Sequence, residues 1–180
     1  MNELQELQIE HYRGRAKNAM QDYLVHKLLY PKVYLDADLD GWKLDILAID
    51  RTGVGDVHGV RLVPWEPGHS DDHGYSDYLE KAVDAAVRDF VDFPGHFRYL
   101  AVICTVPDKQ PWIPSKPLKN QCLAADGVGR LGILYLNVTE ENAEVRVLLR
   151  AERFRSSKEI VELADKFVAE HTANWEYREE

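Results

Sequence analysis

The chain has few cysteines, no long apolar run and a shortage of positive charge. Its 180 residues include only Cys104 and Cys122, too few for a disulfide framework, and no C-x-x-C pair. No apolar run approaches the ~18 residues that a membrane-spanning helix needs, and the acidic N-terminal residues lack the apolar stretch of a signal peptide. We therefore expect a cytoplasmic protein with reduced thiols and no membrane partner, in which Cys122 is the more exposed thiol.

Lysine and arginine number 22 against 31 aspartates and glutamates, which gives a formal charge of −9. This acidity argues against a general polyanion binder, because such binding depends on cations that neutralise phosphates. Most of the negative charge lies within residues 33–100, so basic patches elsewhere are compatible with it. With 45% hydrophobic residues the chain can bury an ordinary core, and we expect a single domain over residues 1–180 with its core at about 14–150.

Hydrophobic spacing predicts helices and strands in alternation. Apolar residues three and four apart predict helices over 14–29, 76–90 and 156–174. Apolar runs and alternating patterns predict six strands, over 32–38, 42–50, 56–64, 97–105, 131–137 and 144–149. Four prolines within 107–117 predict a loop or an extended arm. This order predicts an α/β fold with a mixed central sheet flanked by helices.

Three short motifs suggest ligand sites but have simpler structural interpretations. Asp36–Gly41 matches the first half of a calcium loop, yet the twelfth position is Leu47 and not a glutamate, so a hairpin with an Asp-Gly turn is favoured. The glycines of residues 127–132 fit a dinucleotide fingerprint as a string, but they lead into a strand and not into a helix. The two imidazoles and two carboxylates of His69–His73 lie in a Gly/Pro-rich loop that fixes no metal geometry, so a solvated loop is favoured.

Asp45 is the most unusual residue, because it lies within the apolar run Leu44–Ile49. A buried carboxylate without a partner is costly. A cation, an arginine or a set of backbone donors must therefore meet it, unless it lies at the mouth of the strand. Such carboxylates are often functional, although structural ion pairs imitate them.

The order of elements around Asp45 resembles that of the PD-(D/E)XK restriction-endonuclease-like superfamily. A helix precedes a hairpin that enters the buried strand Trp42–Leu47, and a further strand and helix follow. The strand Phe97–Ile103 and the glycine-led strand Asp126–Leu134 are also similar to later parts of that fold, so the resemblance covers roughly residues 14–150. The resemblance implies that Asp45 binds Mg²⁺, and that an acid and a lysine two residues apart on the third strand complete a nuclease site.

The third strand departs from this pattern. Within residues 57–65 no acid and lysine stand two apart, and Gly59 and Arg61 occupy the positions with the required spacing. Glycine cannot bind a metal, and arginine is a poor substitute for a lysine that contacts water. Asp45 alone therefore carries over from the resemblance.

Nearby residues offer displaced candidates for the missing chemistry. Asp56 or Glu66 could supply an acid, and His58 could supply a base. Phosphate contacts are expected from four basic residues, Arg13, Arg15, Lys116 and Lys119.

Three hypotheses follow for the function. We favour a nuclease-like fold that has lost its chemistry and serves as a nucleic-acid-associated binding or assembly module. The second hypothesis is an active nuclease with displaced catalytic residues, and only this one requires Mg²⁺. The third is a protein–protein module or homodimer that uses the arm 107–117, which carries Trp112.

Overall fold

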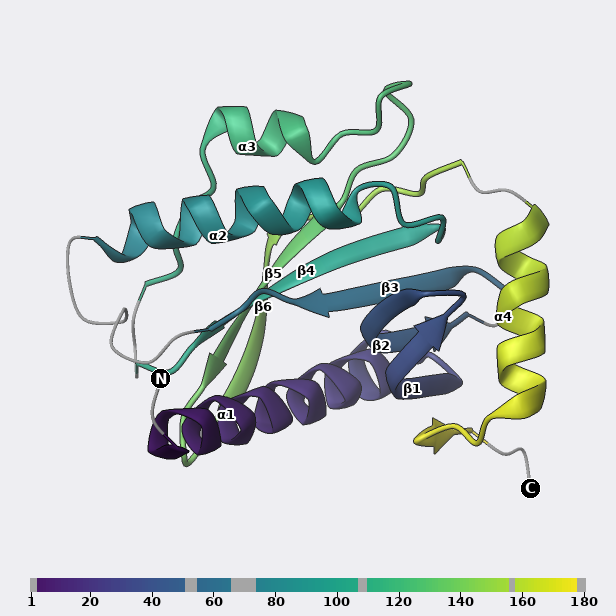
Figure 1. Ribbon diagram of the computed structural model, residues 1–180, viewed down its shortest axis with the longest axis horizontal. Helices are drawn as coiled ribbons and strands as arrows, with labels where there is room; N and C mark the ends of the chain where they lie inside the picture. Colours follow the sequence, from purple (N-terminus) through teal and green to yellow (C-terminus); the bar gives the residue numbers. More distant parts are fainter. Residues whose placement is uncertain (1–2, 51–54, 66–73, 107–109, 156–157, 178–180) are drawn as a thin grey trace.

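The structure is a computed structural model that describes residues 3–50, 55–65, 74–106, 110–155 and 158–177 (Figure 1). Seven strands form one mixed sheet in the order β6-β5-β4-β3-β2-β1-β7. Their bounds are β1 Lys32–Leu39, β2 Trp42–Ile49, β3 Val57–Leu62, β4 Phe97–Cys104, β5 Gly132–Val138, β6 Ala143–Leu149 and β7 Trp175–Glu176. The pairs β3–β4 and β4–β5 are parallel, and the other neighbours are antiparallel. The predicted mixed α/β fold is therefore confirmed.

Helices cover both faces of this sheet. The helix α1 (Glu3–Asp22) continues into a π-helical turn, η1 (Tyr23–Lys27), and lies across one face, whereas α2 (Tyr75–Phe90) lies across the other (Figure 1). The short helix α3 (Lys116–Gln121) lies outside α2, and α4 (Lys158–Glu170) packs beside β1 and β3. No described helix is long and apolar enough to cross a membrane.

Each face of the sheet has its own apolar core, which explains why the helices form where they do. On the α2 face, Val83, Val87 and Phe90 are buried at the three-and-four spacing that predicted this helix. On the α1 face, Ala16 and Met20 are buried against the sheet. The small Ala16 brings α1 close to the strands, and this closeness positions the polar side chains of α1 near β2.

The proline-rich segment differs from the predicted arm. Ser115 caps α3 by accepting a hydrogen bond from the Leu118 N–H, and Pro117 lies in the first turn of that helix. Trp112 is buried in the core of the α2 face, so its ring packs within the chain, while Ile113 is 79% exposed. Residues 107–109 lie outside the described part. The prediction of an extended arm is therefore wrong from Lys116 onward.

Asp36–Gly41 forms the predicted hairpin turn and not a calcium loop. Leu39 pairs with Trp42 across a two-residue turn in which Asp40 and Gly41 both have positive φ, 51° and 88°. The Gly41 N–H donates to an Asp38 oxygen at 2.8 Å, and Lys43 pairs with the same carboxylate. His69–His73 lies outside the described residues.

The hairpin also changes faces halfway along its length. Leu35 and Ile46 pack on the α1 face, whereas Ala37 and Leu44, two residues further toward the tip on each strand, pack on the α2 face. Regular strands would keep these residues on one face. Asp36, with a φ of 53°, lies at the switch on β1, and Asp45 lies opposite it on β2.

Candidate nucleic-acid cleft between β2 and β3

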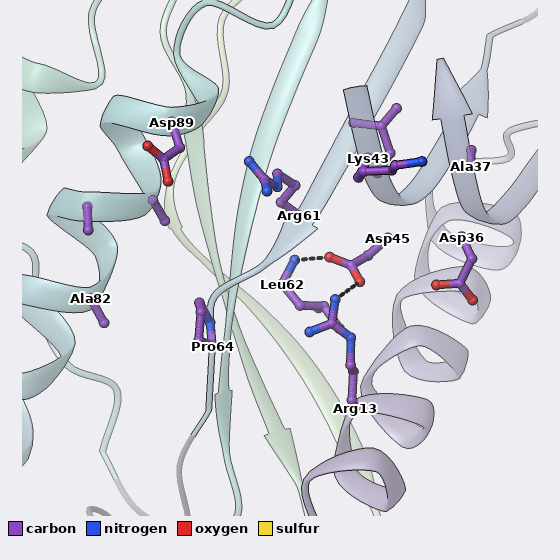
Figure 2. Close-up of a pocket in the computed structure, with 13 residues that line it drawn as sticks. Arg13, Asp36, Ala37, Lys43, Asp45, Arg61, Leu62, Pro64, Ala82 and Asp89 are labelled. Atoms are coloured by element: carbon purple, nitrogen blue, oxygen red, sulfur yellow. Dashed lines mark hydrogen bonds and ion pairs between the residues drawn. The ribbon is translucent and has the colours of Figure 1, made fainter. Parts of the chain in front are cut away.

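The strands β2 and β3 separate beside Asp45. Their pairing ends at Ile46 and Val60. Directly after β3, the Val63 N–H donates to the Ala101 carbonyl on β4, so the preceding N–H, that of Leu62, points toward β2. This N–H donates to Asp45 Oδ2 at 2.7 Å. The carboxylate thus satisfies a backbone donor that the divergence of the strands leaves open (Figure 2).

Two cations of α1 meet the other oxygen of Asp45. Arg13 Nη2 donates to Asp45 Oδ1, and Lys17 Nζ lies 3.8 Å from the same atom while pairing with Asp36. Arg13 and Lys17 are four residues apart and therefore share one face of the helix. The Asp45 side chain is only 6% exposed, so these partners offset part of the cost of burying its charge. The sequence required a cation, an arginine or backbone donors beside Asp45, and the structure supplies both an arginine and a backbone N–H.

A cavity of about 380 Å³ opens beside this pair, between the hairpin, β3 and α2. Its charged lining consists of three cations and three acids, Arg13, Lys43, Arg61, Asp36, Asp45 and Asp89. The cavity is therefore close to neutral although the chain is strongly acidic.

Arg61 extends from β3 into this cavity (Figure 2). Its guanidinium carbon lies 5.8 Å from the centre of the Phe90 ring on α2. Among the described residues, no acid forms an ion pair with Arg61 within 4.0 Å. Arg13 and Lys43, the other two cations of the lining, each form an ion pair with an aspartate. Its charge is the one in the described lining that is most available to a bound anion.

The position two residues before Arg61 is closed to any side chain. A Cβ placed on Gly59 would meet Phe93 Cε1 at 2.4 Å, and a Cβ on Gly95 would meet the same atom at 2.3 Å. The Phe93 ring is fully buried between these two glycines. The site where the resemblance implies a catalytic acid is therefore occupied by an aromatic ring of the core.

The displaced acids lie elsewhere or outside the described residues. Asp56 precedes β3 at the end far from Asp45, about 16 Å from Arg61 along an extended strand. Asp56 pairs with Arg153 at 2.9 Å, and its Oδ1 lies 3.5 Å from His96 Nε2. Burial is the largest influence on Asp56 and opposes its ionisation, but the hydrogen bond from Arg153 and the nearby charges of Arg153, His96 and His58 together outweigh it and lower the pKa of the carboxyl. Glu66 belongs to a segment that the structure does not describe.

His58 faces the α1 side of the sheet and not the cleft that holds Arg61. Its Nδ1 lies 3.1 Å from the Tyr30 hydroxyl, and its ring stacks on Phe97 with centroids 4.6 Å apart. Burial lowers the pKa of His58 to about 4, so the imidazole is neutral at ordinary pH. The structure does not bring this histidine together with Asp45.

The four basic residues predicted to contact phosphate do not share a surface. Arg13 reaches the cleft, but Arg15 donates to the Thr139 carbonyl at 2.6 Å, beyond β5. Lys116 and Lys119 lie on α3, which is separated from α1 by α2 and the sheet (Figure 1). Sequence reasoning missed that Arg13 and Lys17 serve Asp45, although their spacing of four residues could have suggested a shared cationic face.

The donor set of the described cleft does not fit a magnesium ion. Magnesium prefers octahedral oxygen ligands, usually one or two carboxylates with waters. Both oxygens of Asp45 already have partners, and Asp36 is held by Lys17. Within the described residues no group of three or more histidine, cysteine or acidic side chains could hold a metal. The arrangement offers instead a cationic group, Arg61, beside a neutralised carboxylate.

Both thiols are fully buried, which corrects the expectation that Cys122 is the more exposed of the two. Cys122 directly follows α3 and lies in the core of the α2 face, and burial raises its pKa to about 11. Its N–H and carbonyl are engaged with Leu118 and Leu131. Neither cysteine is placed to act as a nucleophile.

No family model and no curated protein matches the chain. The solved structures that are weakly similar to it include the following two. The SPO1766 protein of unknown function from Silicibacter pomeroyi is 12% identical, with 88% of this chain and 85% of that chain covered and a TM-score of 0.49. SfsA of Pyrococcus furiosus, in complex with Ca²⁺, is 13% identical, with 80% and 65% covered and a TM-score of 0.34. The strands and helices of the chain itself show its class, an α/β fold with a mixed sheet flanked by helices.

Proposed function

We propose that the chain is a nuclease-like protein without hydrolytic activity, and that the cleft between β2 and β3 binds the phosphate backbone of a nucleic acid. The observation that carries the loss of hydrolytic activity is the closed position at Gly59. The Phe93 ring fills the space that a catalytic acid would need, 2.4 Å from the nearest possible Cβ. A second metal ligand from that strand position is therefore sterically excluded.

The state of Asp45 supports the same proposal. Its two oxygens accept hydrogen bonds from Arg13 and from the Leu62 N–H, so the carboxylate is held as a structural anion. Arg61, which extends into the cavity of the cleft, favours an anionic ligand, because its planar guanidinium matches the oxygens of a phosphate. The neutral lining lets a phosphate approach in spite of the acidic chain.

Binding is tested with fluorescently labelled DNA and RNA oligonucleotides, single- and double-stranded, in anisotropy titrations. We expect Arg61→Ala to weaken binding about tenfold and to reduce the dependence of log K on log salt by about one phosphate contact. Arg88→Ala is the matched control, since Arg88 is an exposed arginine of α2 whose charge is paired with Asp84. Equal binding by the wild type and Arg61→Ala would contradict the proposed role of the cleft.

Cleavage is tested on the same oligonucleotides with added Mg²⁺ or Mn²⁺. We expect no cutting of any substrate. Metal-dependent cutting that Asp45→Asn abolishes would overturn the proposal and establish the active nuclease in its place. Asp45→Asn keeps the size of the side chain, so its folded state is checked by circular dichroism before the assay.

A further inference from the structure

The strand β6 leaves one edge of the sheet open. Among the described strands it pairs only with β5, so its outer edge carries backbone N–H and C=O groups with no strand beside them. Residues 143–147 hold a regular register with β5 and contain no proline, and their two charged residues, Glu144 and Arg146, have opposite signs, so a second copy of the strand can compensate the charges that otherwise protect such an edge. We propose that β6 pairs antiparallel with β6 of a second copy of this chain, so that two sheets join about a two-fold axis.

The symmetry limits the possible registers. A two-fold axis perpendicular to the sheet keeps each face on the same side in both copies, and the interface is made twice by the same residues. Residues that lie opposite each other must then point to the same face. Because side chains alternate between faces along a strand, the axis passes beside one residue and not between two.

Charge selects Val145 as the residue on the axis. Glu144 and Arg146 are each 48% exposed and pair with each other at 2.8 Å. With the axis at Val145, Glu144 of each copy lies opposite Arg146 of the other, which gives two attractive pairs. An axis at Glu144 or at Arg146 would oppose like charges, and an axis at Val147 would set Arg146 against Leu148.

The other face of the strand supports the same register. Ala143, Val145 and Val147 alternate onto the face that α1 covers, as the packing of Val145 shows. A cavity of about 510 Å³ lies there between the end of α1, η1 and β6, and its lining includes the apolar Ala143 and Val145 as well as the charged Asp22 and Lys27. Val147 is 50% exposed. With Val145 on the axis, Val147 of the second copy lies opposite the small Ala143, at the edge of this cavity.

Sedimentation and cross-linking test the dimer and its register. We expect the wild type to sediment as a dimer at micromolar concentration. Val145→Cys should form a disulfide-linked dimer under mild oxidation, because its two copies face each other across one strand pair. Val147→Cys should not, because it lies opposite Ala143. A wild type that stays monomeric up to 100 μM, or a dimer that links through Cys at 147 and not at 145, would overturn the proposal.

Charge exchange separates this interface from any other dimer. We expect Arg146→Glu to raise the dissociation constant of the dimer about tenfold or more, since both attractive pairs become repulsive. The double variant Glu144→Arg/Arg146→Glu should restore the wild-type value. Arg88→Glu on α2 is the control for the change in net charge. Failure of the double variant to recover dimerisation, with its folding verified by circular dichroism, would contradict the register.

Discussion

The contact between Gly59 and Phe93 makes a quantitative prediction about why the cleft has no second acid. A Cβ on Gly59 would lie 2.4 Å from Phe93 Cε1, at least 1.0 Å closer than the 3.4 Å at which ordinary contact begins. The ring has little room to move toward Gly95, because it lies so close to that backbone that a Cβ added there would meet the same ring atom at 2.3 Å. We therefore expect Gly59→Ala to lower the free energy of unfolding by about 3 kcal/mol, the upper end of the usual cost of overpacking.

Urea denaturation followed by circular dichroism measures this change. Phe93→Leu removes the ring atoms that approach Gly59, so the double variant Gly59→Ala/Phe93→Leu should lose less stability than the sum of the two single variants. We expect a coupling free energy of about 1–3 kcal/mol. Gly14→Ala on α1 is the control, because no heavy atom lies within 4 Å of its added methyl. It should stabilise the chain by about 0.5–1 kcal/mol. A Gly59→Ala variant within about 0.5 kcal/mol of the wild type, or additive single variants, would refute the reasoning.

Three further predictions concern buried polar groups. Arg13→Met should lower the free energy of unfolding by about 1–3 kcal/mol, because it removes the hydrogen bond to the buried carboxylate of Asp45. Urea titrations measure this change, and an unchanged midpoint would contradict a stabilising role of Arg13. Burial lowers the pKa of His58 to about 4, against 6.5 in the unfolded chain. Between these two pH values the unfolded state binds more protons than the folded state. The free energy of unfolding should therefore fall by about 3 kcal/mol as the pH drops from 6.5 to 4. His58→Phe should remove that part of the slope, and the same slope in the variant would count against it. Cys104 and Cys122 are both 0% exposed and should react with an aromatic disulfide reagent only when the chain unfolds, whereas rapid labelling of the native protein would disprove their burial.

Most helices and strands could be predicted from the sequence, because they follow from the spacing of apolar residues and from the backbone preferences of single residues. The face of α2 follows from apolar spacing, and the hairpin turn follows from the positive φ that Asp40 and Gly41 tolerate. The short helix α3 was missed because four nearby prolines indicate a loop, yet a proline in the first turn of a helix lacks only an N–H that would be unpaired anyway. The two-residue strand β7 carries too little pattern to be recognised.

The candidate site was predictable in part. Asp45 stands out because an acid interrupts an apolar run, and the missing acid-lysine pair can be read from the third strand. Its partner Arg13 comes from an element 32 residues earlier, and no local rule assigns a partner over that separation. The closed position at Gly59 depends on Phe93, which reaches it only through the packing of the segment after α2. Tertiary contacts of this kind leave no trace in spacing or composition.

The strand order also bears on how the protein reaches its native state. From β1 to β6 every strand lies beside the next one in the chain, so the sheet can grow outward in the order of synthesis. Among the described strands, only β7 pairs with a strand distant in the sequence. It lies near the end of the chain and pairs with β1, so that Val33 and Trp175 are neighbours although they are 142 residues apart. Contacts so distant in sequence form late, because the loop must be closed before they contribute. The strands of the cleft can therefore assemble before the last edge of the sheet is covered, and β1 remains an open edge for most of folding.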